Sequence, residues 1–181
     1  MKITDTHAHY DDSAFDEDRY ELLGRILENS VENIITIGCS LESSKKAIEL
    51  SERFSHIYAS VGIHPSDCMN LPVDYIDILR GMSCNKKVVA IGEIGLDYHY
   101  DGYDRDAQID CFTKQLELAS DLSLPVIIHS REATQDTMEI LKKYRPKGVV
   151  HCFSGSVETA REIINLGMMI SFTGVLTFKN S

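Results

Sequence analysis

Short apolar segments rich in β-branched residues alternate with amphipathic segments, and this alternation constrains the fold more than any other feature. The strand-like segments are Ile3–His7, Asn33–Cys39, Ile57–Ile63, Val88–Ile94, Pro125–His129, Gly148–Cys152 and Met169–Phe172. Apolar residues recur every three or four positions, as one buried helical face requires, in Asp18–Asn29, Ser43–Phe54, Asp74–Met82, Asp104–Leu122, Ala133–Tyr144 and Val157–Leu166. A β–α unit that repeats and is followed by a further strand predicts an α/β fold around a parallel sheet.

The helix ends carry weaker signals. Asp16, Ser43 and Asp74 have side chains that can cap a helix N-terminus, and Gly167 is suited to ending a helix. We find no linker or low-complexity stretch, so the sequence predicts a single domain over residues 1–181.

Polar residues at the ends of the predicted strands distinguish between two architectures. An open, doubly wound sheet would concentrate functional residues where the strand order reverses. A barrel would bring the C-terminal ends of all its strands to one mouth. His7, His64, Glu93, His129 and His151 come from different strands, which favours the barrel. We therefore predict a TIM-type (β/α)8 barrel with about seven of its eight strands in this chain, since a complete barrel takes roughly 250 residues.

A metal site is indicated most directly by His7-Ala8-His9, at the end of a predicted strand. Side chains two residues apart in a strand point to the same face, so these two imidazoles can chelate one ion. Glu93, His129 and His151 each lie at or near the end of an apolar segment. A carboxylate buried at such a position is unfavourable unless it binds a metal or a base. The five residues together predict a metal site in which the two oxygens of Glu93 could bridge two ions.

The ligand types restrict the metal and the chemistry. Imidazole and carboxylate ligands suit Zn, Mn, Fe or Co, whereas Mg prefers more oxygen. Two neighbouring ions polarise a phosphoryl oxygen and generate hydroxide near neutral pH. We therefore predict two divalent metal ions (Mg, Mn or Zn) as cofactors. Because imidazole binds metal only when neutral, the metal should be lost below about pH 6.

Other polar residues have two interpretations each. His64 is either a substrate contact or a support for the metal ligands. Arg131 could bind an anionic group as a bidentate fork, or it is a surface arginine at the entry to a helix. Arg105 and Lys179 are weaker candidates for the same role, and Asp97 is expected to support a neighbouring loop.

Charge and cysteine content exclude several classes of protein. The net charge of -10 argues against a broad, non-specific nucleic-acid binder, but it permits action on a nucleic-acid end. Five cysteines without a CxxC pair argue against a disulfide framework and a cysteine zinc site. No apolar run approaches the roughly 18 residues of a membrane span, and no signal-peptide pattern opens the chain. We expect no membrane contact and a cytoplasmic location, or a nuclear one in a eukaryotic cell.

Several motifs of the chain occur together in one known family: Asp5–His9, Gly62–Pro65, Ile91–Tyr98, Gln115–Ala119, Pro125–Arg131, His151–Gly155 and Ser171–Asn180. Over essentially its whole length the chain resembles the TatD family of metal-dependent deoxyribonucleases. The resemblance implies an amidohydrolase-like TIM barrel that hydrolyses phosphodiester bonds in DNA, often from the 3′ end. It also implies that His7, His9 and Glu93 hold one metal, and that Glu93, His129 and His151 hold or approach the second.

The chain departs from the family pattern after its seventh predicted strand. The resemblance implies a Glu-Thr-Asp-like motif on an eighth strand, whose Asp binds metal and activates water, and no such motif follows Ser181. The chain thus resembles a family member shortened before its last strand. An unpaired barrel edge would favour self-association. Many related amidohydrolases bridge their metals with a modified lysine where this chain has Glu93, which favours the TatD branch.

Three functions are consistent with these observations. The first is a metal-dependent deoxyribonuclease that acts on DNA or nucleotide ends, with Glu93 as the catalytic residue and His64 and Arg131 as contacts to the scissile phosphate. The second is a catalytically impaired, shortened metal-binding form that acts through a partner or as a dimer. The third keeps the barrel and the metals but cleaves an ester or an amide.

Overall fold

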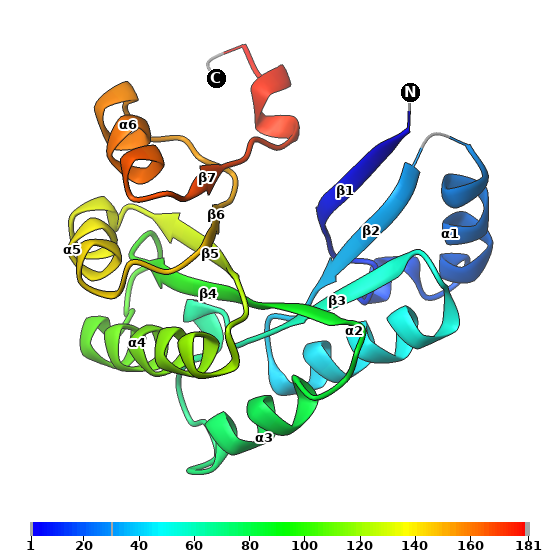
Figure 1. Cartoon of the computed structure of the whole chain (residues 1–181), viewed down its shortest axis with the longest axis horizontal. Coiled ribbons are helices and arrows are strands. Elements are labelled where there is room, and N and C mark those ends of the chain that lie inside the picture. Colours follow the sequence, from blue (N-terminus) through cyan, green and yellow to red (C-terminus); the bar gives the residue numbers. More distant parts are fainter. Residues whose placement is uncertain (1, 30, 180–181) are drawn as a thin grey trace.

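The computed structural model describes residues 2–29 and 31–179, so Met1, Ser30 and the predicted domain end at Asn180 and Ser181 lie outside it. The described residues form one sheet of seven strands in chain order: β1 (Ile3–Ala8), β2 (Val31–Ile37), β3 (Ile57–Val61), β4 (Val88–Asp97), β5 (Val126–Arg131), β6 (Gly148–Val150) and β7 (Met169–Ile170). Consecutive strands pair in parallel. The sheet curls into a half-barrel that is open between β1 and β7 (Figure 1). The predicted α/β fold is therefore confirmed.

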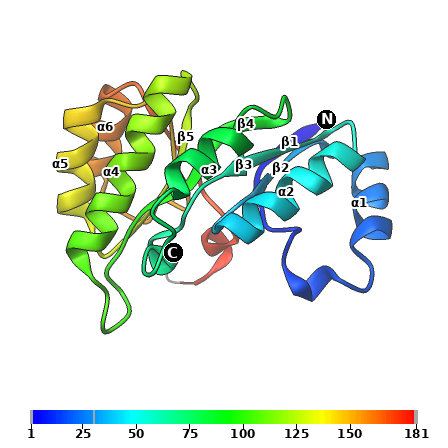
Figure 2. The same ribbon diagram turned by 90° about the horizontal axis from the view of Figure 1, so that it is seen from below.

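Helices connect the strands along the outer side of the curled sheet (Figures 1 and 2). In the described residues they are α1 (Arg19–Glu28), α2 (Leu41–Arg53), α3 (Tyr75–Met82), α4 (Arg105–Leu122), α5 (Thr134–Tyr144) and α6 (Val157–Asn165). Short 3-10 turns are formed by η1 (Ser13–Phe15), η2 (Pro65–Asp67) and η3 (Gly174–Thr177). Among the described helices, none has the length and apolar character needed to cross a membrane.

Two of the three predicted helix starts are wrong by two or three residues. Asp16 ends the η1 turn, so α1 begins only after Asp18. The side chain of Ser40 accepts a hydrogen bond from the backbone N–H of Ser43, so Ser40 caps α2 and Ser43 lies in its first turn. Asp74 precedes α3 as predicted. The errors arise because several residues near each helix start can act as caps, and only packing selects one of them.

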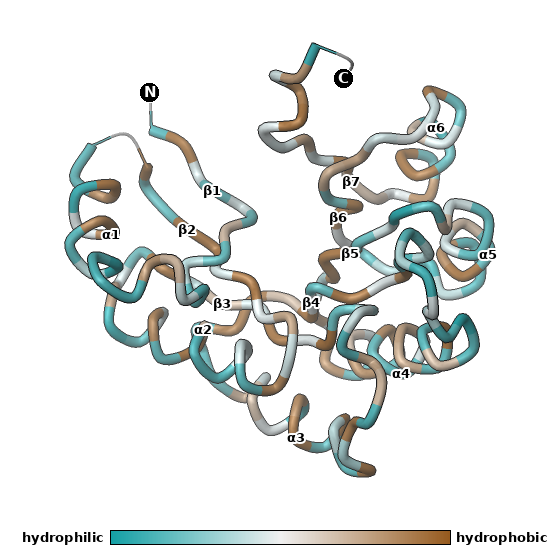
Figure 3. Tube along the Cα trace, turned by 180° about the vertical axis from the view of Figure 1, so that it is seen from behind, coloured by the Kyte–Doolittle hydropathy of each residue, from teal (hydrophilic) through white to brown (hydrophobic). Residues whose placement is uncertain are grey.

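The core lies on both faces of the sheet because side chains alternate along each strand. Ile128 belongs to the large cluster between the sheet and the outer helices. Ile127, its neighbour, packs with Ile37 and Ala90 in a smaller cluster, which lies on the concave face. Figure 3 shows hydrophobic residues along β2, β4 and β5. His129 lies two positions after Ile127 and therefore shares the concave face, where the site is built.

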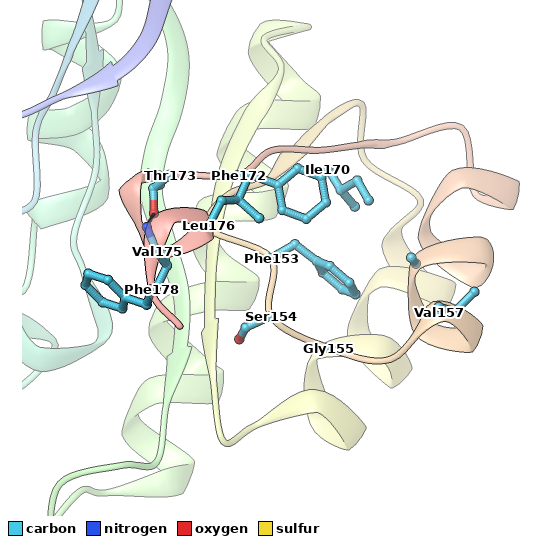
Figure 4. A pocket seen from close by; sticks show the side chains of 11 residues that line it. Phe153, Ser154, Gly155, Val157, Ile170, Phe172, Thr173, Val175, Leu176 and Phe178 are labelled. Atoms are coloured by element: carbon cyan, nitrogen blue, oxygen red, sulfur yellow. Dashed lines mark hydrogen bonds between the residues drawn. The ribbon is translucent and has the colours of Figure 1, made fainter. Parts of the chain in front are cut away.

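An apolar hollow lies at the β7 end of the sheet (Figure 4). Its volume is about 530 Å³, and its lining includes Phe153, Ile170, Phe172, Leu176 and Phe178. The lining contains no histidine and no carboxylate, so this hollow is not the predicted metal site. Phe172 is 53% exposed and Phe178 is 66% exposed. Exposed apolar surface of this kind favours contact with another apolar surface.

Candidate metal centre

Glu93 lies at the centre of the cluster because the side-chain alternation of β4 slips by one residue. Ile91 and Ile94 are three positions apart, yet both pack in the outer cluster, and the β4–β5 register shifts between them. The slip turns Glu93 to the concave face, where 3% of it is exposed. Close approach of β5 requires Gly95 (φ +144°), because a Cβ there would lie 1.9 Å from the carbonyl oxygen of His129.

One oxygen of Glu93 faces the two histidines at the end of β1. Glu93 Oε2 lies 3.2 Å from His7 Nε2 and 3.8 Å from His9 Nε2. The two Nε2 atoms are 3.2 Å apart. These imidazoles therefore converge on one point, as the His-x-His spacing predicts.

The other oxygen of Glu93 faces β5 and the end of β6. Glu93 Oε1 lies 2.6 Å from His151 Nε2 and 3.0 Å from His129 Nδ1, and these two nitrogens are 3.4 Å apart. His64 Nε2 lies 3.8 Å from the same oxygen. The rings of His7 and His151 stack with their centroids 3.9 Å apart, so the two groups are adjacent. Glu93 thus divides its two oxygens between two sets of imidazole nitrogens.

The spacing of the nitrogen atoms fits coordination of divalent metal ions. Nitrogen ligands about 2.0–2.1 Å from a tetrahedral ion lie about 3.3–3.4 Å from one another. The nitrogen pairs at His7–His9 and His129–His151 are separated by 3.2 Å and 3.4 Å. Imidazole nitrogens with a carboxylate oxygen also form a donor set that suits Zn or Mn. The residues present therefore fit metal binding in both geometry and chemistry.

Burial and close contacts shift the pKa values of Glu93, His7 and His64 towards the forms that bind metal. Burial acts to raise the pKa of Glu93, but hydrogen bonds from His129, His151 and His7 outweigh it and hold that pKa well below its usual range. Burial lowers the pKa of His7, and it lowers the pKa of His64 to about 4. Metals bind an ionised carboxylate and neutral imidazoles, which are the forms that these shifts favour for Glu93 and His7.

Asp97 contacts the far side of the His129 ring. Asp97 Oδ2 lies 3.1 Å from His129 Nε2, while His129 Nδ1 faces Glu93. Burial acts to lower the pKa of His129, but the two carboxylates outweigh it, and the pKa is raised. When Nε2–H donates to Asp97, Nδ1 keeps a lone pair for a metal, as is usual for histidine ligands.

Asp97 has one predicted role and one that its sequence position did not predict. Its Oδ1 accepts a hydrogen bond from the backbone N–H of His99, so Asp97 supports the following loop as expected. Its contact with His129 was missed because the strand was predicted to end at Ile94, whereas β4 runs to Asp97. The available signal was the polar residue Asp97 itself, which lies three positions after the predicted strand end at Ile94.

Cys39 is a member of the cluster that was not predicted from the sequence. Its Sγ lies 3.8 Å from Glu93 Oε2 and 3.9 Å from His9 Nδ1. Burial, and then the charge of Glu93, raises the pKa of this thiol. All five cysteines are free, as predicted. Cys39 ends a predicted strand, as the histidines do, and this position could have indicated that it belongs to the cluster.

The predicted anion-binding residues lie outside the cluster. Arg131 donates to the hydroxyl of Tyr100 at 3.3 Å, and its guanidinium lies 5.3 Å from the centroid of that ring. Arg105 donates to both oxygens of Asp136, at 2.7 Å and 2.9 Å. Lys179 is exposed at the end of the described chain. Arg131 and Lys179 thus keep their roles only as predictions, while Arg105 is already engaged by a carboxylate.

Two buried glutamines of α4 fix the backbone next to the cluster. Gln108 accepts from the N–H of Asp97 at 2.8 Å and donates to its carbonyl oxygen at 2.8 Å. Gln115 accepts from the N–H of Ile63 at 2.7 Å and donates to its carbonyl oxygen at 3.1 Å. Residues seven apart share one helix face, so α4 holds both backbone segments at once. His64, which directly follows Ile63, is placed by this contact.

Comparison with known proteins decides the family. The family model described as TatD related DNase matches residues 4–181. The chain belongs to this TatD family. A relative from Bacillus subtilis, the uncharacterized metal-dependent hydrolase YabD, is 40% identical over 182 residues, which cover 99% of this chain and 71% of the relative. Another, the 3′-5′ ssDNA/RNA exonuclease TatD of Cronobacter sakazakii, is 36% identical over 165 residues, which cover 90% of this chain and 63% of the relative.

A solved structure of the TatD family matches the half-barrel. YjjV, a TatD homologue from Escherichia coli K12, superposes with a TM-score of 0.92 at 33% sequence identity. The match covers 99% of this chain and 71% of YjjV. The curled sheet therefore has the TIM-barrel architecture of its TatD relatives, as predicted. By family the chain is a TatD-type metal-dependent hydrolase with a candidate His/Glu metal cluster.

Proposed function

We propose that this TatD-family chain is a divalent-metal-dependent phosphodiesterase that hydrolyses DNA, in the manner of a 3′ to 5′ exonuclease. The observation that carries the proposal is the division of Glu93, whose two oxygens face different pairs of histidines. A carboxylate placed in this way is suited to bridging two metal ions, as phosphoryl chemistry uses. The name of the Cronobacter relative supports a single-stranded nucleic acid as substrate.

Each residue of the cluster has a role in this proposal. His7, His9 and Glu93 Oε2 would hold one divalent ion (Mg, Mn or Zn), and His129, His151 and Glu93 Oε1 would hold a second. Bound ions of this kind polarise a phosphoryl oxygen and lower the pKa of water.

Neighbouring residues would position the ligands and the substrate. Asp97 holds the His129 ring through Nε2, so that Nδ1 stays directed at the metal position. His64, 3.8 Å from Glu93, is the proposed contact to the scissile phosphate inside the site. Arg131 is the proposed contact at the rim.

The test is hydrolysis of single-stranded DNA by the purified chain with Mg²⁺, Mn²⁺ or Zn²⁺. Substrates labelled at the 5′ or the 3′ end distinguish removal of 3′ nucleotides from internal cleavage, and an RNA of the same sequence tests the sugar. We expect stepwise shortening from the 3′ end, lost in Glu93→Gln. Glu132→Gln, at an exposed carboxylate that pairs with His99, is a matched control. Absence of hydrolysis in all three metals, or full activity of Glu93→Gln, would refute the proposal.

An alternative proposal is a catalytically impaired form that binds metal and acts through a partner or as a dimer. The exposed apolar residues around β7 and η3 favour it, because they offer a surface for self-association at the barrel edge. Bound metal without hydrolysis of any phosphodiester, together with a dimer in sedimentation velocity, would support it. Activity equal to that of the Cronobacter exonuclease would exclude it.

Two further points remain proposals. The same barrel could cleave an ester or an amide, and nitrophenyl phosphodiesters compared with nitrophenyl esters would separate these activities. We also propose a cytoplasmic location, or a nuclear one in a eukaryotic cell, and fractionation of cells that produce the chain would test it.

A further inference from the structure

A second hollow lies beside the metal centre, between the segment after β3 and the loop after β4. Its volume is about 200 Å³, and its lining comes from residues within 65–69 and 97–108. Both segments begin at the cluster. His64 caps η2 on one side, and Asp97, which contacts His129, lines the hollow on the other. A ligand in this hollow would therefore adjoin a group held at the metal centre.

Two tyrosine rings that line the hollow are exposed but held in place. Tyr100 is 64% exposed and Tyr103 is 45% exposed. The Tyr103 ring stacks on Tyr98 with centroids 4.6 Å apart and planes 12° apart, and the Tyr98 hydroxyl donates to Asp136 at 2.6 Å. Arg131 fixes the Tyr100 hydroxyl. Aromatic faces held in this way lose little conformational entropy when a flat ring stacks on them.

The remaining polar lining consists largely of hydrogen-bond acceptors. Asp101, Asp104 and Ser66 line the hollow, as does Asp97, whose two oxygens already contact His99 and His129. Carboxylates accept hydrogen bonds from N–H groups and repel phosphate oxygens. The exocyclic amines of cytosine and adenine are donors of the required kind. The hollow is smaller than the roughly 300–1,000 Å³ of pockets for whole drug-sized ligands, so its size suits one ring system.

We propose that this base hollow, lined by Ser66, Asp97, Tyr100, Asp101, Tyr103 and Asp104, binds a nucleobase with an exocyclic amine. The base belongs to the nucleotide whose phosphate lies at the metal centre. The inference rests on the proposed function, because it requires a nucleotide substrate. Arg131, which contacts Tyr100 on the same rim, would supply positive charge to the adjoining phosphate.

The test compares binding of deoxycytidine 5′-monophosphate, thymidine 5′-monophosphate and deoxyribose 5-phosphate to the whole chain in EDTA, by NMR titration. Without metal, nothing is hydrolysed and the readout is affinity alone. We expect deoxycytidine monophosphate to bind about 5- to 150-fold more tightly than the sugar phosphate, the range for stacking of one base. Thymidine monophosphate should bind less tightly than deoxycytidine monophosphate, because thymine lacks the amine.

Variants assign the effect to the hollow. Tyr100→Ala and Tyr103→Ala should remove most of the advantage of the base, while Tyr103→Phe should keep it. Tyr20→Ala is the matched control, because Tyr20 is 48% exposed on α1 and stacks on Phe54, outside the hollow. Circular dichroism spectra matching the wild type show that each variant is folded.

The outcomes separate this inference from the proposed function. Equal binding of nucleotide and sugar phosphate overturns the base hollow even if the chain hydrolyses DNA. An advantage of the base that survives in both Tyr100→Ala and Tyr103→Ala also overturns it. An advantage lost in those variants supports the hollow even if the chain hydrolyses nothing, in which case only the proposed function fails.

Discussion

Replacing Gln115 by Met should destabilise the protein strongly, although the new side chain is apolar and similar in size. Gln115 is fully buried, and its amide satisfies both the N–H and the carbonyl oxygen of Ile63. Met has no donor for the carbonyl oxygen, and its thioether sulfur is only a weak acceptor for the N–H. A buried backbone group left without a partner costs about 1–3 kcal/mol, so the two together cost about 2–4 kcal/mol after partial relaxation. That loss is a large share of the roughly 5–15 kcal/mol that stabilises a typical domain.

Urea unfolding measures the effect directly. With a slope of about 2 kcal/mol/M, in the middle of the usual range, the midpoint should fall by roughly 1–2 M while the slope stays unchanged. Gln135→Met is the matched control, because Gln135 is exposed on α5 and its amide donates to the exposed carboxylate of Glu139 rather than to a buried backbone group. Its effect should stay within about 0.5 kcal/mol. If Gln115→Met changed stability no more than Gln135→Met, then Gln115 on α4 would not hold the backbone before His64.

Three further predictions concern the cluster and the strand that carries Glu93. Asp97→Asn should weaken Mn²⁺ or Zn²⁺ binding about 10- to 100-fold in calorimetry, because His129 loses the carboxylate that fixes its tautomer; unchanged affinity would contradict this role. In the metal-free protein, His64 takes up a proton at about pH 4 when folded and near 6.5 when unfolded. The unfolded state therefore binds more protons between these values, so this residue lowers the free energy of unfolding as pH falls from 6.5 to 4. His64→Gln should make urea-derived stability less dependent on pH in that window, and an unchanged slope would count against the assignment. Gly95→Ala should lower the free energy of unfolding by more than about 3 kcal/mol, because the new Cβ would meet the backbone of β5. The control is Gly81→Ala on α3, where the space is open, and it should be neutral or stabilising by up to about 1 kcal/mol. Thermal unfolding measures both variants.

Much of the candidate site could be predicted because strand ends of a parallel sheet converge. His7 and His9 were placed on one face by local geometry alone, and their Nε2 atoms do lie 3.2 Å apart. His129 and His151 ended apolar segments whose ends had to meet at one edge of the sheet. Cys39 and the contact of Asp97 with His129 were missed because they depend on contacts between distant positions and on where a strand ends. Cys39 is an ordinary buried residue type, and its contact with Glu93 joins positions 54 residues apart.

The sequence by itself determined the alternation of strands and helices. With it came the edge of the sheet, at the C-terminal ends of the strands, where ligand-type residues gather. The sequence did so because apolar periodicity and strand-end polarity are local properties of the chain. Only the tertiary structure decided which oxygen of Glu93 faces which histidines, since the alternation slips between Ile91 and Ile94. Strict alternation from Ala90 would have turned Glu93 away from His129. Register is set by packing between β4, β5 and the outer helices, and no local pattern in the sequence encodes that packing.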